Sequence, residues 1–435
     1  MTAGVVPGGP VFVSYRQSDG TIPVTQLAWL LRAAGVPVWH DRTDLPPGET
    51  EQRLQEALGD GLSGAVLLVT PDIALSSVVQ HVELPALLGL HVDADFVLAV
   101  ANLVRKPDGK VDYGAPDRLL NQPKALQGLK QYAADSRAKL ATLVRDLARF
   151  RAGRIAAARR GSVEPLHISL QTRGGPVAHA KGAADLPIML RPAASGRIPD
   201  RAGLLDLQST LPFLPETYAQ AGAAAIRVTG GAHLSVAFAV GAALPAALVG
   251  AVAVEGTDGA VWTCGTVSSG AAAGLVRRVS GGMGPARLPG EPHAVVAFVD
   301  LLPSSSEAAY TRLLSESAGF DAWEYLRPSA PGPLDPATAG LMIEEVAGRL
   351  RSLAQRYGNA TLHLLLRCPF PVALLLGRLC NTTRIVVYEW DDTEVPGDPD
   401  LRPRYVPVLA VRAGSADGPI TEVLLPAAPT PGGTP

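Results

Sequence analysis

A glutamate inside an apolar, helix-forming segment is the first residue of this sequence that could do chemistry. Ser77 and Gln80 have the spacing of a helix capping box. Glu83 then lies about two turns into the helix, too far in to serve the cap. Pro85 removes a backbone donor and predicts a kink beside the carboxylate. An ordinary surface glutamate fits the same pattern, so the residues alone leave both interpretations open.

Two further polar segments lie where apolar strands are expected to end. The turn at 14–19 carries hydroxyls, an arginine and a carboxylate. In the loop 41–49, Pro46 and Pro47 restrict the backbone and Gly48 releases it. This composition predicts a rigid flap at the carboxyl edge of a sheet, although an ordinary connection would have the same composition.

The elements that would position these residues alternate between strands and helices. Strands are expected at 11–15, 36–40, 65–70 and 96–103, and helices around 24–31, 50–58 and 77–90. This alternation is typical of a parallel sheet with helices on both faces. It predicts a small open α/β domain.

A helical connector follows this domain. Apolar residues recur at three and four positions between residues 123 and 161, which predicts one long helix or a pair. The arginines of this segment fit a solvated helix face, or a contact with an anionic ligand or a neighbouring subunit. They are Arg145, Arg149, Arg151, Arg154, Arg159 and Arg160.

The C-terminal part contains an internal duplication. Segment 226–244 aligns with 362–380, and each copy reads strand, short turn and apolar helix. Gly241 then corresponds to Gly377, and a further strand follows each copy. Two similar α/β halves predict a ligand crevice at their strand ends.

The turn between strand and helix in each copy could bind phosphate, because backbone N–H groups at a helix N-terminus attract anions. Every such turn in an α/β fold has these groups, so a purely structural role stays open. An aromatic residue at the end of the strand VYEW could stack on a base or pack in the core. The candidate residues are Gly230, Gly231, His233, Arg367, Pro369 and Trp390.

Composition argues against several classes of protein. The 38 basic and 40 acidic residues nearly cancel, and no DNA-binding motif is recognisable, so DNA is not an expected partner. The cysteines Cys264, Cys368 and Cys380 lack metal-ligand spacing and indicate buried thiols in a reducing compartment, so no metal is expected. No export signal is seen, which predicts a cytoplasmic protein. The uncharged run 234–254 is broken by glycine and proline, so no membrane span is expected.

The N-terminal segments FVSYRQSDG, VWHDRTDLPPGE and SSVVQHVEL, in this order, resemble the TIR domain over about residues 10–150. The resemblance implies a flavodoxin-like sheet, a proline-containing loop that mediates assembly, and a catalytic role for Glu83, as in members that cleave NAD+. Enzymatic members often carry an aromatic residue shortly before this glutamate, where Val78 and Val79 stand here. NAD+ would be the substrate, with no cofactor, and the residues expected around it are Tyr15, Arg16, Asp41 and Leu45.

The C-terminal segments AHLSVAFAVG, LHLLLRCPFPVALLLGRLCN, VYEW and RYVPVL resemble the SAVED domain over roughly residues 163–415. This domain consists of two fused CARF-like halves that sense cyclic oligonucleotides in bacterial anti-phage defence. In TIR-SAVED proteins of CBASS defence, a cyclic trinucleotide, typically cyclic tri-adenylate, binds and drives assembly, and neighbouring TIR domains complete one another's NAD+ sites.

The sequence therefore predicts a disordered N-terminus (1–9), a TIR domain (10–124), a helical connector (125–161), a SAVED domain (162–420, with halves of about 162–300 and 301–420) and a flexible tail (421–435). The expected function is NAD+ glycohydrolysis to nicotinamide and ADP-ribose or a cyclic form. A cyclic trinucleotide would activate it through self-association into oligomers or filaments, depleting NAD+ in anti-phage defence. The alternative is a non-enzymatic TIR scaffold assembled by the cyclic nucleotide.

Overall fold

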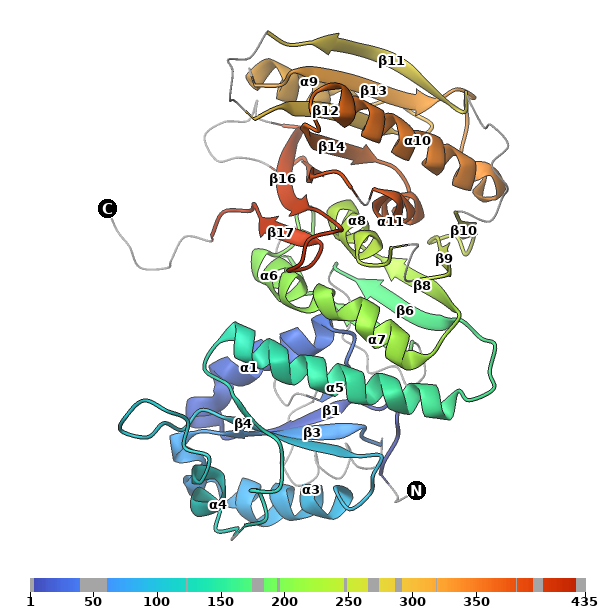
Figure 1. The fold of residues 1–435 in the computed structure, drawn as a ribbon. Helices are drawn as coiled ribbons and strands as arrows, with labels where there is room; N and C mark the ends of the chain where they lie inside the picture. Colours follow the sequence, from blue (N-terminus) through green and yellow to red (C-terminus); the bar gives the residue numbers. More distant parts are fainter. Residues whose placement is uncertain are drawn as a thin grey trace. The chain divides into compact units, whose positions relative to one another are not determined.

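The computed structural model describes residues 4–39, 61–122, 124–173, 184–193, 196–245, 249–264, 274–285, 292–317, 319–380, 382–393 and 402–427 (Figure 1). The chain divides into two compact units. The N-terminal unit comprises Met1–Ser169, Gly175–Met189 and Glu216–Ala223, and the C-terminal unit comprises Leu170–Gly174, Leu190–Pro215 and Ala224–Pro435.

The N-terminal unit is built on a parallel sheet in the order β2-β1-β3-β4-β5. Its strands are β1 (Val11–Ser14), β2 (Val38–Trp39), β3 (Gly64–Val69), β4 (Val97–Asn102) and β5 (Gln131–Ala133). This is the strand order of the flavodoxin-like fold, as predicted. The sequence analysis missed β5, because this half-buried edge strand has only three residues and no apolar run.

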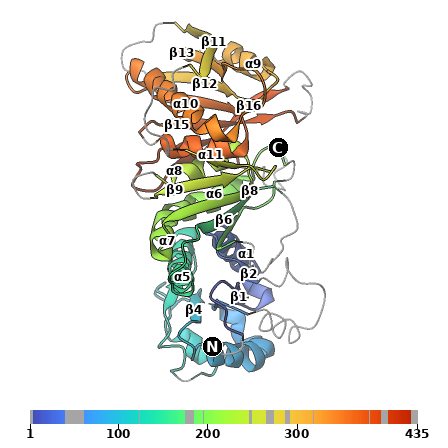
Figure 2. The ribbon, with the colours of Figure 1, turned by 90° about the vertical axis from the view of Figure 1, so that its right-hand side faces the viewer.

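Helices cover both faces of this sheet (Figures 1 and 2). Alternate residues of β3 divide between two cores, as the pleat of a strand requires. Val66 and Leu68 pack with α1 (Gln17–Ala33) and α5 (Arg137–Ala158), whereas Ala65 packs on the opposite face with α3 (Leu84–Leu90). A short helix, α4 (Ala115–Leu119), follows β4.

The helical connector is present as α5, whose apolar face belongs to the core of the N-terminal unit. It is shorter than the predicted 125–161, since β5 occupies part of that range. Most arginines of the connector form ion pairs or hydrogen bonds with neighbouring groups, so they do not form a free solvated face. Arg145 and Arg149 pair with Glu216, Arg154 with Asp95 and Arg159 with Asp185, while the buried Arg151 donates to the carbonyls of Gly8 and Asp185.

The N-terminal residues 4–9 differ from the disorder expected for 1–9. Val5 is buried and forms a parallel bridge with Leu62, and the Val6 amide donates to the Leu62 carbonyl at 2.9 Å. Burial of the apolar Val5 side chain orders this segment. Its glycine-rich and proline-rich composition had predicted disorder.

In the first half of the C-terminal unit, β8 (Ala225–Gly231) and β9 (Ala251–Glu255) are parallel, and β10 (Val261–Thr263) is antiparallel to β9. Along the chain, helix α6 (Arg201–Thr210) precedes β8, and helix α8 (Leu234–Ala242) lies between β8 and β9. The remaining elements between α5 and β8 are β6 (Leu166–Gln171), β7 (Leu186–Met189), a 3₁₀ turn η3 (Leu211–Phe213) and α7 (Leu214–Ala221).

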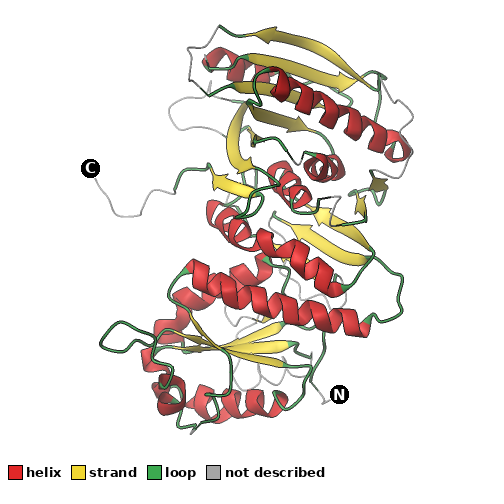
Figure 3. Ribbon diagram, viewed as in Figure 1, coloured by secondary structure: helices red, strands yellow, loops and turns green. Residues whose placement is uncertain are grey.

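The second half contains a sheet in the order β11-β13-β12-β14-β15-β16-β17. Its strands are β11 (Val276–Met283), β12 (Ala294–Asp300), β13 (Ala322–Pro328), β14 (Thr361–Arg367), β15 (Ile385–Asp391), β16 (Arg404–Val411) and β17 (Ile420–Val423). Its helices are α9 (Ala308–Glu316), α10 (Pro336–Arg356) and α11 (Phe370–Leu379). Figure 3 shows α10 along this sheet.

Two predicted boundaries are wrong. Strands β11 and β12 pair within the second sheet, so the halves divide before Val276 and not near residue 300. β17 pairs with β16, so residues 421–423 are a strand and not part of a flexible tail, while residues 428–435 lie outside the described residues. Strand pairing between distant segments decides both boundaries, and local composition does not encode it.

The predicted duplication is confirmed: β8, α8 and β9 repeat as β14, α11 and β15. Helices α8 and α11 contact each other at equivalent positions. A Cβ atom on Gly241 would lie 1.9 Å from the Leu374 carbonyl oxygen, and one on Gly377 would lie 2.1 Å from that of Phe238. Because Phe238 and Leu374 also correspond in the alignment, the contact is reciprocal, as across a two-fold axis.

The apolar run at 234–254 contains α8, which ends at Ala242. None of the helices in the described ranges is long and apolar enough to cross a membrane.

Candidate functional site

In the N-terminal unit, the carboxylate of Glu83 lies at the carboxyl end of the parallel sheet. Ser14, the last residue of β1, donates a hydrogen bond from Oγ to Glu83 Oε2 at 2.6 Å. Both side chains are buried, with 1% of Ser14 and 6% of Glu83 exposed. Glu83 is therefore not the surface glutamate that the sequence alone allowed.

The helix that carries Glu83 is irregular. The segment at 77–90 contains a π-helical turn, Val79–Glu83, directly before α3 and Pro85. The cap is also one residue earlier than predicted, because the Val79 amide donates to Ser76 Oγ at 3.4 Å. π-Helical turns of this kind are frequent at functional sites, since the extra residue redirects side chains.

The turn after β1 holds Tyr15 and Arg16, two of the residues expected around NAD+. Arg16 donates from Nη1 to the Asp72 carbonyl at 2.7 Å, and Asp19 accepts from the Thr70 hydroxyl at 2.8 Å. Tyr15 is 8% exposed and packs in the core with α1, so its ring is not open to a ligand here.

The other two, Asp41 and Leu45, and the proline-containing loop lie outside the described residues. A pocket of 360 Å³ in this unit is lined by other residues, namely Tyr113, Gly114, Gln127, Leu129 and Gln131. It contains none of the residues predicted to bind NAD+.

In the C-terminal unit, the N-terminus of α8 is already occupied by a side chain. Glu389 of β15 accepts hydrogen bonds at Oε1 from the Ser235 amide and the Ser235 hydroxyl, both at 2.7 Å. Burial raises the pKa of Glu389 to about 7, even though the bonds from Ser235 and the charge of Arg173 act in the other direction. The Ser235 amide, in the first turn of α8, is therefore bonded to a carboxylate of the chain itself.

His233 lies immediately before α8 and is fully buried. Its Nδ1 is 2.8 Å from Thr172 Oγ1, which also accepts from the His233 amide at 2.9 Å. Burial, and next the nearby charge of Arg173, lower the pKa of His233 to about 4, so the ring is neutral at pH 7.

The two glycines before His233 differ in role. Gly230 has φ of 109°, and a Cβ there would lie 2.4 Å from the Leu170 carbonyl oxygen, so this position requires glycine for packing. A Cβ on Gly231 would meet nothing within 4 Å, which leaves this backbone approachable.

The equivalent turn of the second half is also less open to phosphate than predicted. Pro369 caps α11, and Pro371 stands where the first half has Ser235, so this turn lacks the corresponding amide donor. Both prolines are visible in the sequence. Counting the backbone N–H groups of the two equivalent turns could therefore have predicted this difference between the halves.

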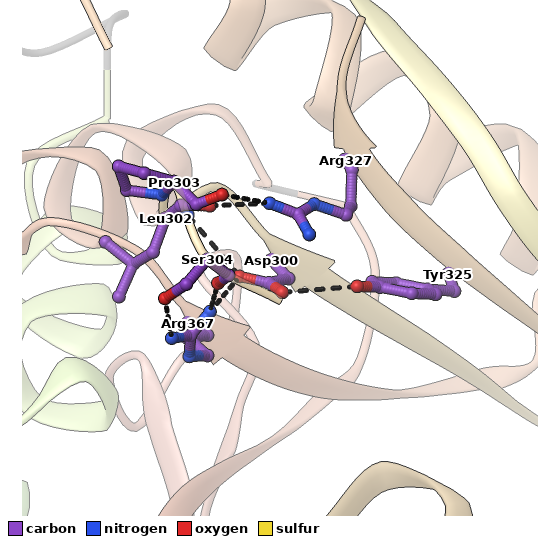
Figure 4. A network of polar contacts seen from close by, with 7 residues as sticks. All are labelled: Asp300, Leu302, Pro303, Ser304, Tyr325, Arg327 and Arg367. Atoms are coloured by element: carbon purple, nitrogen blue, oxygen red, sulfur yellow. Dashed lines mark hydrogen bonds and ion pairs between the residues drawn. The ribbon is translucent and has the colours of Figure 1, made fainter. Parts of the chain in front are cut away.

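Arg367 belongs to a network with Asp300, which is fully buried (Figure 4). Arg367 Nη1 donates to Asp300 Oδ1 at 2.8 Å, and Tyr325 donates to Asp300 Oδ2 at 3.2 Å. Arg367 also holds Ser304, while Arg327 donates to the carbonyls of Leu302 and Pro303. The arginine predicted to bind phosphate therefore fixes the loop after β12.

Trp390 lies beside Glu389 on β15 and is partly buried. The guanidinium of Arg197 lies 5.7 Å from the centre of its ring and pairs with Asp392 at 3.0 Å. Tyr388, in contrast, is 5% exposed and bonded to His363 at 2.8 Å, so it packs in the core.

The structure thus places His233, Ser235 and Glu389 together, whereas Trp390 faces the other side of β15 with Tyr388, and Arg367 lies in a separate network. Sequence reasoning missed Glu389 and Asp300. Each is an acidic residue within or at the end of an apolar strand, a signal that could have singled them out, because buried carboxylates need partners.

Comparisons with known proteins identify both units. Residues 213–411 match the family described as the SMODS-associated and fused to various effectors sensor domain, SAVED, and residues 11–108 match the TIR domain family. No curated protein matches the chain.

Several solved structures are similar to the chain. One is the Acinetobacter baumannii Cap4 SAVED/CARF-domain containing receptor with the cyclic trinucleotide 2'3'3'-cAAA, at 12% identity and a TM-score of 0.45, covering 90% of this chain and 97% of that one. The same receptor with 3'3'3'-cAAA has 15% identity, coverage of 89% and 96% and a TM-score of 0.44. The Moraxella osloensis Cap4 receptor has 12% identity, coverage of 89% and 97% and a TM-score of 0.41.

The protein is thus of the class in which a flavodoxin-like effector domain is fused to a duplicated α/β sensor domain. More particularly, the chain carries a TIR domain at its N-terminus and a SAVED domain at its C-terminus.

Proposed function

We propose that this protein is an NAD+ glycohydrolase whose TIR domain is activated when the SAVED domain binds a cyclic trinucleotide. The observation that supports the enzymatic part is the buried Glu83 carboxylate, hydrogen-bonded to Ser14 at 2.6 Å at the carboxyl edge of the sheet. NAD+ is the substrate, and depletion of NAD+ serves anti-phage defence of the CBASS type.

The reaction breaks the bond between nicotinamide and ribose. Nicotinamide leaves as a neutral base, and positive charge develops on the ribosyl centre, which a nearby carboxylate stabilises. A buried carboxylate is more effective in this role than an exposed one, because surrounding water screens its charge less. Water, or a nucleophilic group of the nucleotide itself, then attacks the ribosyl carbon, which gives ADP-ribose or a cyclic form.

The sensing part is supported by the match to the SAVED family and by the contact between Arg197 and Trp390. Related receptors have been solved with cyclic trinucleotides. A base could stack on the partly buried indole of Trp390, and Arg197 supplies positive charge beside it. Among the cyclic oligonucleotides, cyclic tri-adenylate is the first to test.

The test is release of nicotinamide from NAD+ by the full-length chain, with and without a panel of cyclic oligonucleotides. We expect turnover only with an activating trinucleotide, and a loss of at least ~100-fold in Glu83→Gln, the scale of one electrostatic catalytic group. Unchanged thermal unfolding of the variant would show that the fold is kept. Full activity of Glu83→Gln would remove this carboxylate from the mechanism.

The alternative is a TIR scaffold that assembles on ligand binding without turnover. Val78 and Val79, where enzymatic members often have an aromatic residue, favour it. Ligand-dependent assembly with no nicotinamide release under any condition of the same assay would select this alternative.

A further inference from the structure

A carboxylate from one half of the C-terminal unit lies at a helix N-terminus of the other half. Glu389, on β15, is 6% exposed and accepts two hydrogen bonds from Ser235 in the first turn of α8. The N-terminus of a helix carries positive partial charge and favours an anion. Glu389 therefore acts as an internal anion at a position where a phosphate group could bind.

A second polar group at this helix end has an unfilled bonding position. His233, the residue before α8, is 0% exposed, and its Nδ1 is bonded to Thr172. Its Nε2 makes no hydrogen bond of standard geometry to any described residue, and the Gly196 backbone interacts with the ring. Buried polar atoms of this kind are rare in native structures, so a ligand atom is a reasonable partner.

A positive charge beside Glu389 also suits a phosphate group. Trp390, the next residue of β15, faces the other side of the sheet and does not belong to these surroundings. Arg173 is exposed, and its charge acts on both Glu389 and His233. An arginine beside a helix N-terminus is an arrangement that binds a phosphodiester.

We propose that Glu389 is an internal competitor of the ligand, so that a phosphodiester of the bound cyclic oligonucleotide displaces its carboxylate from Ser235. This inference rests on the proposed function, because it takes a cyclic oligonucleotide as the ligand. Two anions cannot share the same donors without strong repulsion. The ionised carboxylate therefore opposes binding, and the protonated carboxyl group does not.

Proton uptake by Glu389 can be followed near neutral pH. Its pKa is raised to about 7 by burial. The other groups that face it come from α8, β16 and the ends of β6 and β14, and they do not change charge between pH 6 and 8. The pKa of His233 is lowered by burial to about 4, the pKa values of Cys368 and Tyr405 are raised by burial, and Arg173 contributes a positive charge that acts on Glu389.

The experiment is equilibrium binding of cyclic tri-adenylate to the full-length chain at pH 6, 7 and 8 and constant ionic strength. We expect wild-type affinity to be about tenfold higher at pH 6 than at pH 8, as follows for a group with a pKa of about 7 that must be protonated for binding. Glu389→Gln should bind at pH 8 as tightly as the wild type does at pH 6, without pH dependence.

Glu324→Gln is the matched control. Glu324 is also 6% exposed, but it lies on β13 and pairs with Arg356. This variant should keep the pH dependence of the wild type. If both variants lost the pH dependence of binding, the effect would come from general damage to the protein, and the inference would be overturned.

The outcomes separate the two proposals. Wild-type binding that is equal at pH 6 and 8, or a folded Glu389→Gln variant that binds more weakly, overturns the role of Glu389 but leaves the proposed function standing. If the wild type binds none of the cyclic oligonucleotides at any of these pH values, the proposed function fails and this inference fails with it. The wild-type profile needs no variant, so misfolding of Glu389→Gln does not compromise the test.

Discussion

At the residue scale, the hydrogen bond between Ser14 and Glu83 fixes where the carboxylate points. The donor is the last residue of β1, an interior strand of the sheet, and the acceptor is the last residue of a π-helical turn. A bond from a hydroxyl to an ionised carboxylate is about twice as strong as a neutral one. Ser14 is therefore a positioning residue for Glu83 in the proposed reaction.

Replacing Ser14 by alanine should lower nicotinamide release by about tenfold, because an unheld carboxylate spends less time in the productive orientation. The loss should appear in kcat more than in KM. Ser63→Ala provides the control, since Ser63, the residue before β3, is also buried but its Oγ contacts the Pro10 carbonyl instead. Equal losses in the two variants would mean that Ser14 acts only through stability.

Glu389 also makes stability depend on pH. Its pKa is raised to about 7 in the folded chain from an ordinary value of 4.5, so the native state binds more protons than the unfolded state between these values. Stability from this group is present at low pH and is lost as the pH rises through 7.

His233 contributes in the opposite direction below pH 6.5, because its pKa is lowered in the folded state. The difference in unfolding free energy between the wild type and Glu389→Gln, measured in urea at several pH values, isolates the glutamate. We expect the wild type to lose stability relative to the variant from pH 5 to pH 8. A difference that does not change with pH would contradict this assignment.

At the element scale, the contact between α8 and α11 depends on two glycines at equivalent positions of the duplication. Each lets a helix backbone approach a carbonyl oxygen of the other helix, at a distance that no Cβ atom permits. The sequence alignment paired Gly241 with Gly377 without showing that they serve a single interface.

Gly241→Ala should destabilise the C-terminal unit by at least about 1–3 kcal/mol, since the new Cβ would lie 1.9 Å from the Leu374 oxygen and the helices must separate. Gly348→Ala is the control, because Gly348 is inside α10 and a Cβ there meets nothing within 4 Å. That variant should be more stable by about 0.5–1 kcal/mol through helix propensity. Urea unfolding measures both, and a neutral Gly241→Ala would mean that this close contact is absent in solution.

At the scale of the whole molecule, activation by ligand requires that the ligand bind the active assembly better than the free chain. We therefore expect cyclic tri-adenylate to raise the sedimentation coefficient, with nicotinamide release rising over the same range of ligand concentration. Head-to-tail contacts that do not close would give filaments.

Glu83→Gln should assemble as the wild type does while releasing no nicotinamide, because the substitution lies in the other unit from the proposed ligand site. Analytical ultracentrifugation of both chains is the measurement. Sedimentation that stays constant at saturating ligand would exclude activation by assembly.

The sequence by itself determined the parts that depend on local pattern. Apolar periodicity predicted the parallel sheet and the duplicated strand–helix–strand units, since residues that face a core repeat at fixed intervals. The motifs predicted both domain families, and the position of Glu83 in its segment predicted a candidate site.

Tertiary structure alone decided what lies against these residues. It paired Glu83 with Ser14 across 69 positions and Ser235 with Glu389 across 154, and it assigned Arg367 to Asp300. It also added β5 to the first sheet and β11 and β12 to the last. The reason is physical: a buried polar group or a strand edge must find a partner, and a partner this distant in sequence is set by how the chain packs.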